Sequence, residues 1–244
     1  MAPRRPRQLE LPAPRTWGGC RSGAGRKPAR GRAGPSHSVR PAHDLRHPVH
    51  VTLRARQGTS SLRSDAIFPE LRRALAASGG RSFRLLHFSV QTDHIHLIVE
   101  ADAGQTLARG LQGLAVRCAR VINRCCGHRG AVWAERYHAH PLTTPREMRA
   151  ALVYVLLNFR KHLHAPPGID PLSSGAWFDG WMQPTRAPAA PSPVTPPRTW
   201  LAAAGWRRAG GAIDWREAPA ARPARLTVPG ACGRRRASRG RPSG

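Results

Sequence analysis

The sequence predicts an α+β fold in which a small antiparallel sheet carries helices on one of its faces. Two observations lead to this prediction. Segments in which apolar and polar residues alternate, as they do in strands, are interleaved with segments whose apolar residues recur at helical spacing. All these segments lie between residues 47 and 182, and they follow one another in the order β-α-β-β-α-β-α.

The two ends of the chain have a different composition from its middle. Residues 1–46 contain 11 Lys or Arg against 2 Asp or Glu, and residues 183–244 contain 12 against 2. Both segments are crowded with Pro, Gly and Ala and lack periodic apolar residues. We therefore predict one folded domain, residues 47–182, between a disordered basic arm (1–46) and a disordered Pro/Ala/Arg-rich tail (183–244).

The first half of the domain contains three predicted strands and one helix. Residues 47–55 alternate and are rich in β-branched side chains, which is typical of a strand. Residues 65–80 place apolar side chains on one helical stripe and end in two glycines. Residues 82–91 and 94–101 again alternate, and the short break between them predicts a hairpin.

The second half adds two long helices and a strand. Residues 106–127 have apolar residues at helical spacing, and residues 130–142 are predicted to form the fourth strand. Residues 144–164 begin with Thr144 as the N-cap, and Glu147 completes a capping box. The first six elements have the order of the ferredoxin-like split βαβ fold, and the last helix is an addition to it.

Two histidines, His94 and His96, lie two residues apart in the third predicted strand. Residues i and i+2 of a strand share a face, so the two imidazoles project side by side while Ile95, Leu97 and Val99 face the core. Histidine is the commonest side-chain metal ligand, so the pair is a candidate divalent-metal site. Taken alone, the pair is equally consistent with a solvated sheet face.

The last helix carries Tyr154 and Asn158, which lie four residues apart and therefore on one helical face. The carboxamide oxygen of Asn158 is a possible third ligand for Mg²⁺ or Mn²⁺. The phenol of Tyr154 is a possible nucleophile, although an aromatic residue packed on the sheet explains the same spacing. The other tyrosine, Tyr137, lies on a predicted strand, where we expect it to pack.

Four segments together resemble the HUH-type single-strand tyrosine transposases, and in particular the REP-associated tyrosine transposase branch of the small insertion-sequence enzymes. The segments are "QTDHIHLIVEA", "GLQGLAVRCARVINR", "ERYHAHPLTTPREMRAALVYVLLNFRKH" and "PLSSGAWFDGW", within residues 45–182. The resemblance implies that His94 and His96 bind a divalent metal, Mg²⁺ or Mn²⁺. It also implies that Tyr154 is the nucleophile and that Asn158 completes the metal site.

The chain departs from the pattern of this family at two positions. Many relatives have Asn before the first histidine, where this chain has Asp93, and Pro after the helix Asn, where it has Phe159. Neither departure removes a predicted catalytic group. Asp93 would alter the geometry of its loop or the charge close to the metal.

The activity that the resemblance implies is cleavage and rejoining of single-stranded DNA, as in a DNA transposase or a domesticated relative of one. The tyrosine attacks a phosphate to give a 5′-phosphotyrosine intermediate, and the expected substrate is a palindromic hairpin. Two other functions remain open at this stage. One is a ferredoxin-like module that binds single-stranded DNA or RNA without catalysis, although the strands lack the aromatic pattern of RNA-binding sheets. The other is a metal-dependent phosphoesterase that activates a water molecule.

The charge of the chain fits a partner with a phosphate backbone. The formal net charge is +27 and the isoelectric point is about 11.9. The candidate phosphate contacts on the two long helices are Arg117, Arg120, Arg124, Arg160 and Lys161. Arg117, Arg120 and Arg124 could equally line a solvated helix face.

Other features of the sequence bear on compartment and assembly. No apolar run approaches the roughly 20 residues that span a bilayer, and the basic N-terminus lacks the apolar segment of a signal peptide. The five cysteines include no CxxC pair, which argues against a disulfide framework. We therefore expect a cytoplasmic bacterial protein, associated with the nucleoid when bound to DNA. From the family resemblance, we expect a monomer or a homodimer.

Overall fold

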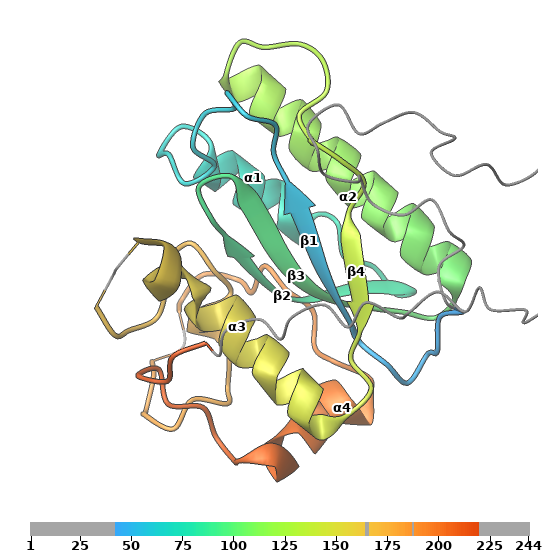
Figure 1. The fold of residues 1–244 in the computed structure, drawn as a ribbon, viewed down its shortest axis with the longest axis vertical. Helices are drawn as coiled ribbons and strands as arrows, with labels where there is room; N and C mark the ends of the chain where they lie inside the picture. Colours follow the sequence, from blue (N-terminus) through green and yellow to red (C-terminus); the bar gives the residue numbers. More distant parts are fainter. Residues whose placement is uncertain (1–41, 164–165, 187, 220–244) are drawn as a thin grey trace, which may run out of the picture. The chain divides into compact units, whose positions relative to one another are not determined.

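A four-stranded antiparallel sheet is the centre of the computed structural model, which describes residues 42–163, 166–186 and 188–219 (Figure 1). The strands are β1 (Val49–Arg54), β2 (Phe83–Val90), β3 (His94–Ala101) and β4 (His138–Pro141). Their order across the sheet is β2-β3-β1-β4, which is the ferredoxin-like order that the sequence predicts. The fourth strand is much shorter than its predicted range of 130–142, because pairing with β1 continues only from His138 to Pro141.

Three helices follow the predicted order: α1 (Phe68–Ala76), α2 (Gly104–Cys125) and α3 (Pro145–Leu163). The shorter helices η1 (Gly175–Trp177), α4 (Trp200–Ala203) and η2 (Gly205–Ala209) come after them. The α3 helix begins as its capping box predicts. The Glu147 amide donates to Thr144 Oγ1 at 3.1 Å, and the Thr144 amide donates to Glu147 Oε2 at 3.2 Å.

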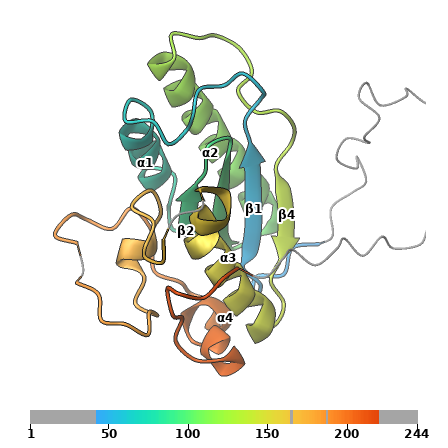
Figure 2. The same cartoon turned by 60° about the vertical axis from the view of Figure 1, so that its left-hand side comes forward.

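The sheet is covered on both faces (Figures 1 and 2). Ile95, Leu97 and Val99 are fully buried in one apolar cluster with α1 and α2, as strand alternation predicts. Ile98, on the other face of β3, belongs to a second cluster that contains the apolar residues of α3. The added helix therefore lies on the sheet face towards which His94 and His96 project.

The chain beyond residue 182 corrects a sequence prediction. The sequence predicts a disordered tail from residue 183, but Ala202, Trp206 and Ile213 are buried in the cluster around α3, and Leu201 is buried as well. The segment 171–181 joins them, because the Phe178 ring lies 5.5 Å from the Trp206 ring. The sequence did not predict this burial, because the few apolar residues that are buried here are irregularly spaced within a Pro/Ala/Arg-rich segment.

The rest of both predicted arms is only partly described. Residues 42–46 belong to the described chain, and the remainder of the arm and tail, residues 1–41 and 220–244, lies outside the described residues. Within the part of the chain that the structure describes, no helix is both long and apolar enough to cross a lipid bilayer.

Candidate active site

Strands β1 and β3 bring three histidines together on the face that α3 covers. His96 is paired directly with Thr52 of β1, and His50 lies two residues before Thr52 on the same face. The rings of His94 and His96 have centroids 4.6 Å apart, and those of His50 and His96 are 5.4 Å apart. His96 is buried, whereas His94 is half-buried at the start of the strand.

Helix α3 places Tyr154 over these histidines. The centroid of its ring is 4.9 Å from that of His96 and 5.6 Å from that of His50, with the rings edge-on in both pairs. Tyr154 is half-buried, so its side chain retains access to solvent. The structure therefore brings together the predicted nucleophile and the predicted metal-binding pair, from elements that are far apart in the sequence.

His50 is a site residue that sequence reasoning missed. It lies within β1 and contacts both His96 and Tyr154. Its Nε2 lies 3.4 Å from His96 Nδ1. The H-x-H spacing could not reveal it, because the contact depends on the pairing register between β1 and β3.

The two predicted metal ligands are oriented through their Nδ1 atoms. His94 Nδ1 donates to Asp93 Oδ1 at 2.6 Å, and His96 Nδ1 lies 3.1 Å from Thr52 Oγ1. Metal-binding histidines are commonly held in this way, with one ring nitrogen bonded to a carboxylate, carbonyl or similar oxygen and the other on the metal. The arrangement is therefore that of two oriented imidazoles.

Asp93, one of the two departures from the family pattern, has a clear place in the site. Partial burial raises the pKa of its carboxyl group, but hydrogen bonds from His94 and Arg54 outweigh this effect, and the net pKa is lowered. Arg54 Nη2 lies 3.1 Å from Asp93 Oδ2. The carboxylate thus stays ionised next to His94, where it adds negative charge beside the imidazole pair.

Asn158 is fully buried one helical turn beyond Tyr154. Its side-chain oxygen and nitrogen both lack a hydrogen-bond partner among the described residues. A buried carboxamide without partners costs about 1–3 kcal/mol, and a cation on its oxygen would remove much of that cost. No group of three His, Cys, Asp or Glu among the described residues could hold a metal. The ligand types of His94, His96 and Asn158, two imidazoles and a carboxamide oxygen, are nevertheless ones that suit a divalent ion.

Tyr137 lies elsewhere. It precedes β4 and packs against the cluster formed with α1 and α2, on the other side of the sheet from Tyr154. This placement agrees with the packing role that the sequence favoured for it.

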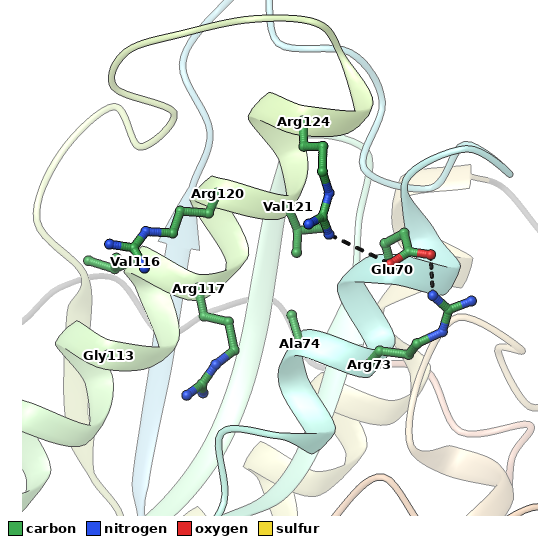
Figure 3. A pocket seen from close by; sticks show the side chains of 9 residues that line it. All are labelled: Glu70, Arg73, Ala74, Gly113, Val116, Arg117, Arg120, Val121 and Arg124. Atoms are coloured by element: carbon green, nitrogen blue, oxygen red, sulfur yellow. Dashed lines mark hydrogen bonds and ion pairs between the residues drawn. The ribbon is translucent and has the colours of Figure 1, made fainter.

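The predicted phosphate contacts on α2 are not near these residues. Arg117, Arg120 and Arg124 line a groove of about 590 Å³ between α1 and α2, together with Arg73 and Glu70 (Figure 3). Glu70 pairs with Arg73 and lies 3.8 Å from Arg124. The groove is therefore positively charged and lies on the helical layer that faces away from Tyr154.

The predicted contacts on α3 have different outcomes. Arg160 Nη1 donates to the carbonyl oxygens of Arg216 and Glu217, at 2.8 and 3.0 Å. These contacts give Arg160 a role in holding the C-terminal segment, and the phosphate contact stays a prediction. The side chain of Lys161 lies outside the described residues.

Comparisons with known proteins found a family model that matches this chain and a solved structure that is similar to it. A family model described as "Transposase IS200 like" matches residues 46–155, which include His50, the histidine pair and Tyr154. A solved structure of a REP-associated tyrosine transposase bound to a REP hairpin is similar, with 19% identity and a TM-score of 0.43. The match covers 52% of this chain and 74% of that one. No curated protein matches the chain.

Proposed function

We propose, from the match of residues 46–155 to the family model of IS200-like transposases, that the chain cleaves and rejoins single-stranded DNA through Tyr154. The observation that carries the proposal is the position of the Tyr154 ring, 4.9 Å from the ring of His96. A nucleophile needs electrophilic groups close by to stabilise the charge on the phosphate that it attacks. Among the described residues, this is the tyrosine that lies beside the histidine pair.

We propose that His94, His96 and Asn158 hold a divalent ion, Mg²⁺ or Mn²⁺. Bound there, the ion would polarise the oxygens of the scissile phosphate. The oriented Nδ1 atoms of the histidines and the unsatisfied carboxamide of Asn158 support this assignment.

The proposed reaction conserves the number of phosphodiester bonds. The Tyr154 phenol loses its proton to solvent, and Oη bonds to phosphorus while the bond between phosphorus and O3′ breaks. The departing O3′ takes up a proton, which leaves a free 3′-OH and a 5′-phosphotyrosine. A 3′-OH from another strand end then attacks the same phosphorus, and Tyr154 leaves and recovers its proton.

We propose that the substrate is single-stranded DNA containing a palindromic hairpin. The net charge of +27 supports a polyanionic partner. The choice of a hairpin rests on the motifs that this chain shares with the REP-associated branch.

A covalent-adduct assay tests the proposal. The full-length chain is incubated with a labelled hairpin oligonucleotide and Mn²⁺, and the products are separated on a denaturing gel. We expect a labelled protein–DNA adduct that Tyr154→Phe abolishes and that Tyr137→Phe, the matched control, retains.

The same gel separates the other functions. Cleavage without an adduct would indicate a water-activating phosphoesterase, and binding without cleavage would indicate a binding module. Normal cleavage by the His94→Ala/His96→Ala double variant would refute the metal assignment.

A further inference from the structure

We propose that Gln91 supplies a further oxygen ligand to the divalent ion, beside His94, His96 and Asn158. This inference rests on the proposed function. Gln91 is one residue beyond β2, in the short turn that leads to the histidine strand.

Pairing between β2 and β3 places Gln91 next to the two histidines. The Gln91 amide donates to the carbonyl oxygen of His94 at 2.8 Å, which closes the hairpin. Ser89 is paired directly with His96, and residues directly opposite each other in a sheet share a face. Gln91 is two residues from Ser89, so alternation puts it on this face too.

The side chain of Gln91 is held on that face with its oxygen unsatisfied. Its Nε2 donates to Ser89 Oγ at 2.7 Å. Its Oε1 is buried and has no hydrogen-bond partner among the described residues, and the residue is only 1% exposed. The nitrogen end is thus anchored, and the oxygen end is left for another group.

Gln91 and Asn158 each have a buried side-chain oxygen without a hydrogen-bond partner among the described residues, and both belong to the layer between the sheet and α3. Helix α3 packs on both β2 and β3. Asn158 is fully buried and lies four residues after Tyr154, on the helical face that contacts His96. Each buried acceptor without a hydrogen bond costs about 1–3 kcal/mol of stability, so a group that contacts both oxygens would remove both costs. A cation satisfies two carboxamide oxygens at once.

The ligand types agree with a hard divalent ion. Mg²⁺ and Mn²⁺ prefer oxygen ligands in octahedral geometry, and imidazole alone would favour zinc or copper. A second carboxamide oxygen brings the protein ligands to two nitrogens and two oxygens. The remaining positions suit phosphate oxygens or water.

Mn²⁺ binding to the full-length protein tests the inference without DNA cleavage. Free Mn²⁺ is measured by its electron paramagnetic resonance signal for the wild type and for Gln91→Met, which keeps the size of the side chain but lacks the oxygen. We expect about 10-fold weaker binding, the lower end of the effect of losing a group that supports a metal site. Gln183→Met is the matched control, because Gln183 Nε2 bonds to Asp214, and we expect it to bind as the wild type does.

Two further measurements exclude a merely structural role. Gln91→Glu keeps an oxygen at the same place, so it should bind Mn²⁺ at least as tightly as the wild type. Without metal, Gln91→Met removes both an unsatisfied acceptor and the hydrogen bond to Ser89, two opposing effects, so its melting temperature should change little. Its rise in melting temperature on adding Mn²⁺ should be smaller than that of the wild type.

The outcomes are distinct. Wild-type affinity in Gln91→Met would overturn the inference and leave the site of His94, His96 and Asn158 standing. A lower metal-free melting temperature with unchanged Mn²⁺ affinity would assign Gln91 to packing. Absence of Mn²⁺ binding in the wild type would overturn both this inference and the metal part of the proposed function.

Discussion

Arg149 on α3 holds the carboxylate of Glu217 with both terminal nitrogens of its guanidinium group. Nη1 donates to Oε2 at 2.9 Å and Nη2 donates to Oε1 at 2.6 Å. Nη2 also donates to the carbonyl oxygen of Ala212 at 3.2 Å. The segment after α4 is therefore fastened to the helix that carries Tyr154.

Removing this carboxylate should destabilise the domain measurably. The Arg149 side chain is only 16% exposed, so Glu217→Ala leaves a largely buried cation without its partner. We expect the free energy of unfolding in urea to fall by about 1–3 kcal/mol. Asp44→Ala is the control, because its partner Arg46 is 83% exposed and solvent screens such a pair, so the loss should be much smaller. Equal losses in the two variants would contradict this account.

Two glycines of α2 should respond in opposite ways to alanine. A Cβ at Gly110 would come within 2.3 Å of the Phe83 ring, whereas one at Gly113 would meet nothing within 4 Å. Gly113→Ala should raise the free energy of unfolding by about 0.5–1 kcal/mol through helix propensity. Gly110→Ala should lower it by about 1–3 kcal/mol through overpacking against β2. Thermal unfolding of both variants checks this, and stabilisation by Gly110→Ala would mean that α2 packs less closely on the sheet.

The part of the site that the sequence predicts is the part that depends on local periodicity. Strand alternation places His94 and His96 on one face, and the spacing of four places Asn158 one turn from Tyr154. Neither His50 nor Gln91 could be found in this way. Their position at the site depends on the register of β1 and β2 against β3, and many registers are compatible with the same alternating pattern.

The burial of the C-terminal segment is a second feature that the sequence alone does not predict. Leu201, Trp206 and Ile213 are spaced irregularly in a segment rich in Ala, Gly and Arg, so no helical or strand period marks them. Trp206 and Ile213 are buried against α3 and Phe178, and only the folded domain creates that surface.

His87 on β2 should make the domain sensitive to mild acid. Burial lowers the pKa of His87 from 6.5 to about 4, and its ring packs edge-on against Phe178 at 5.3 Å. Between these two values the unfolded chain binds a proton that the folded chain does not. The contribution to stability is therefore complete above about pH 6.5 and is lost as the pH falls towards 4.

Urea unfolding at pH 7.5 and pH 5 measures this effect. The wild type should lose on the order of 1–2 kcal/mol more than His87→Leu between the two pH values, since one pKa unit corresponds to about 1.4 kcal/mol. Parallel losses in the two proteins would assign the acid sensitivity to other histidines.

The basic groove between α1 and α2 allows binding and cleavage to be separated. Arg117, Arg120 and Arg124 are on the layer that faces away from Tyr154 (Figure 3), so any phosphate contact there is remote from the chemistry. Changing all three to Gln should weaken binding of the hairpin oligonucleotide. Each lost contact should reduce the slope of log K against log salt concentration by about 0.7–0.9.

At saturating DNA, the same triple variant should still form the adduct with Tyr154, because no residue around the histidine pair is altered. Arg72→Gln is the control for loss of an arginine outside the groove, since Arg72 is exposed on α1 and does not line it. An unchanged salt slope in the triple variant would show that the groove does not contact DNA. Loss of the adduct at saturating DNA would show instead that the groove is needed to position the strand at Tyr154.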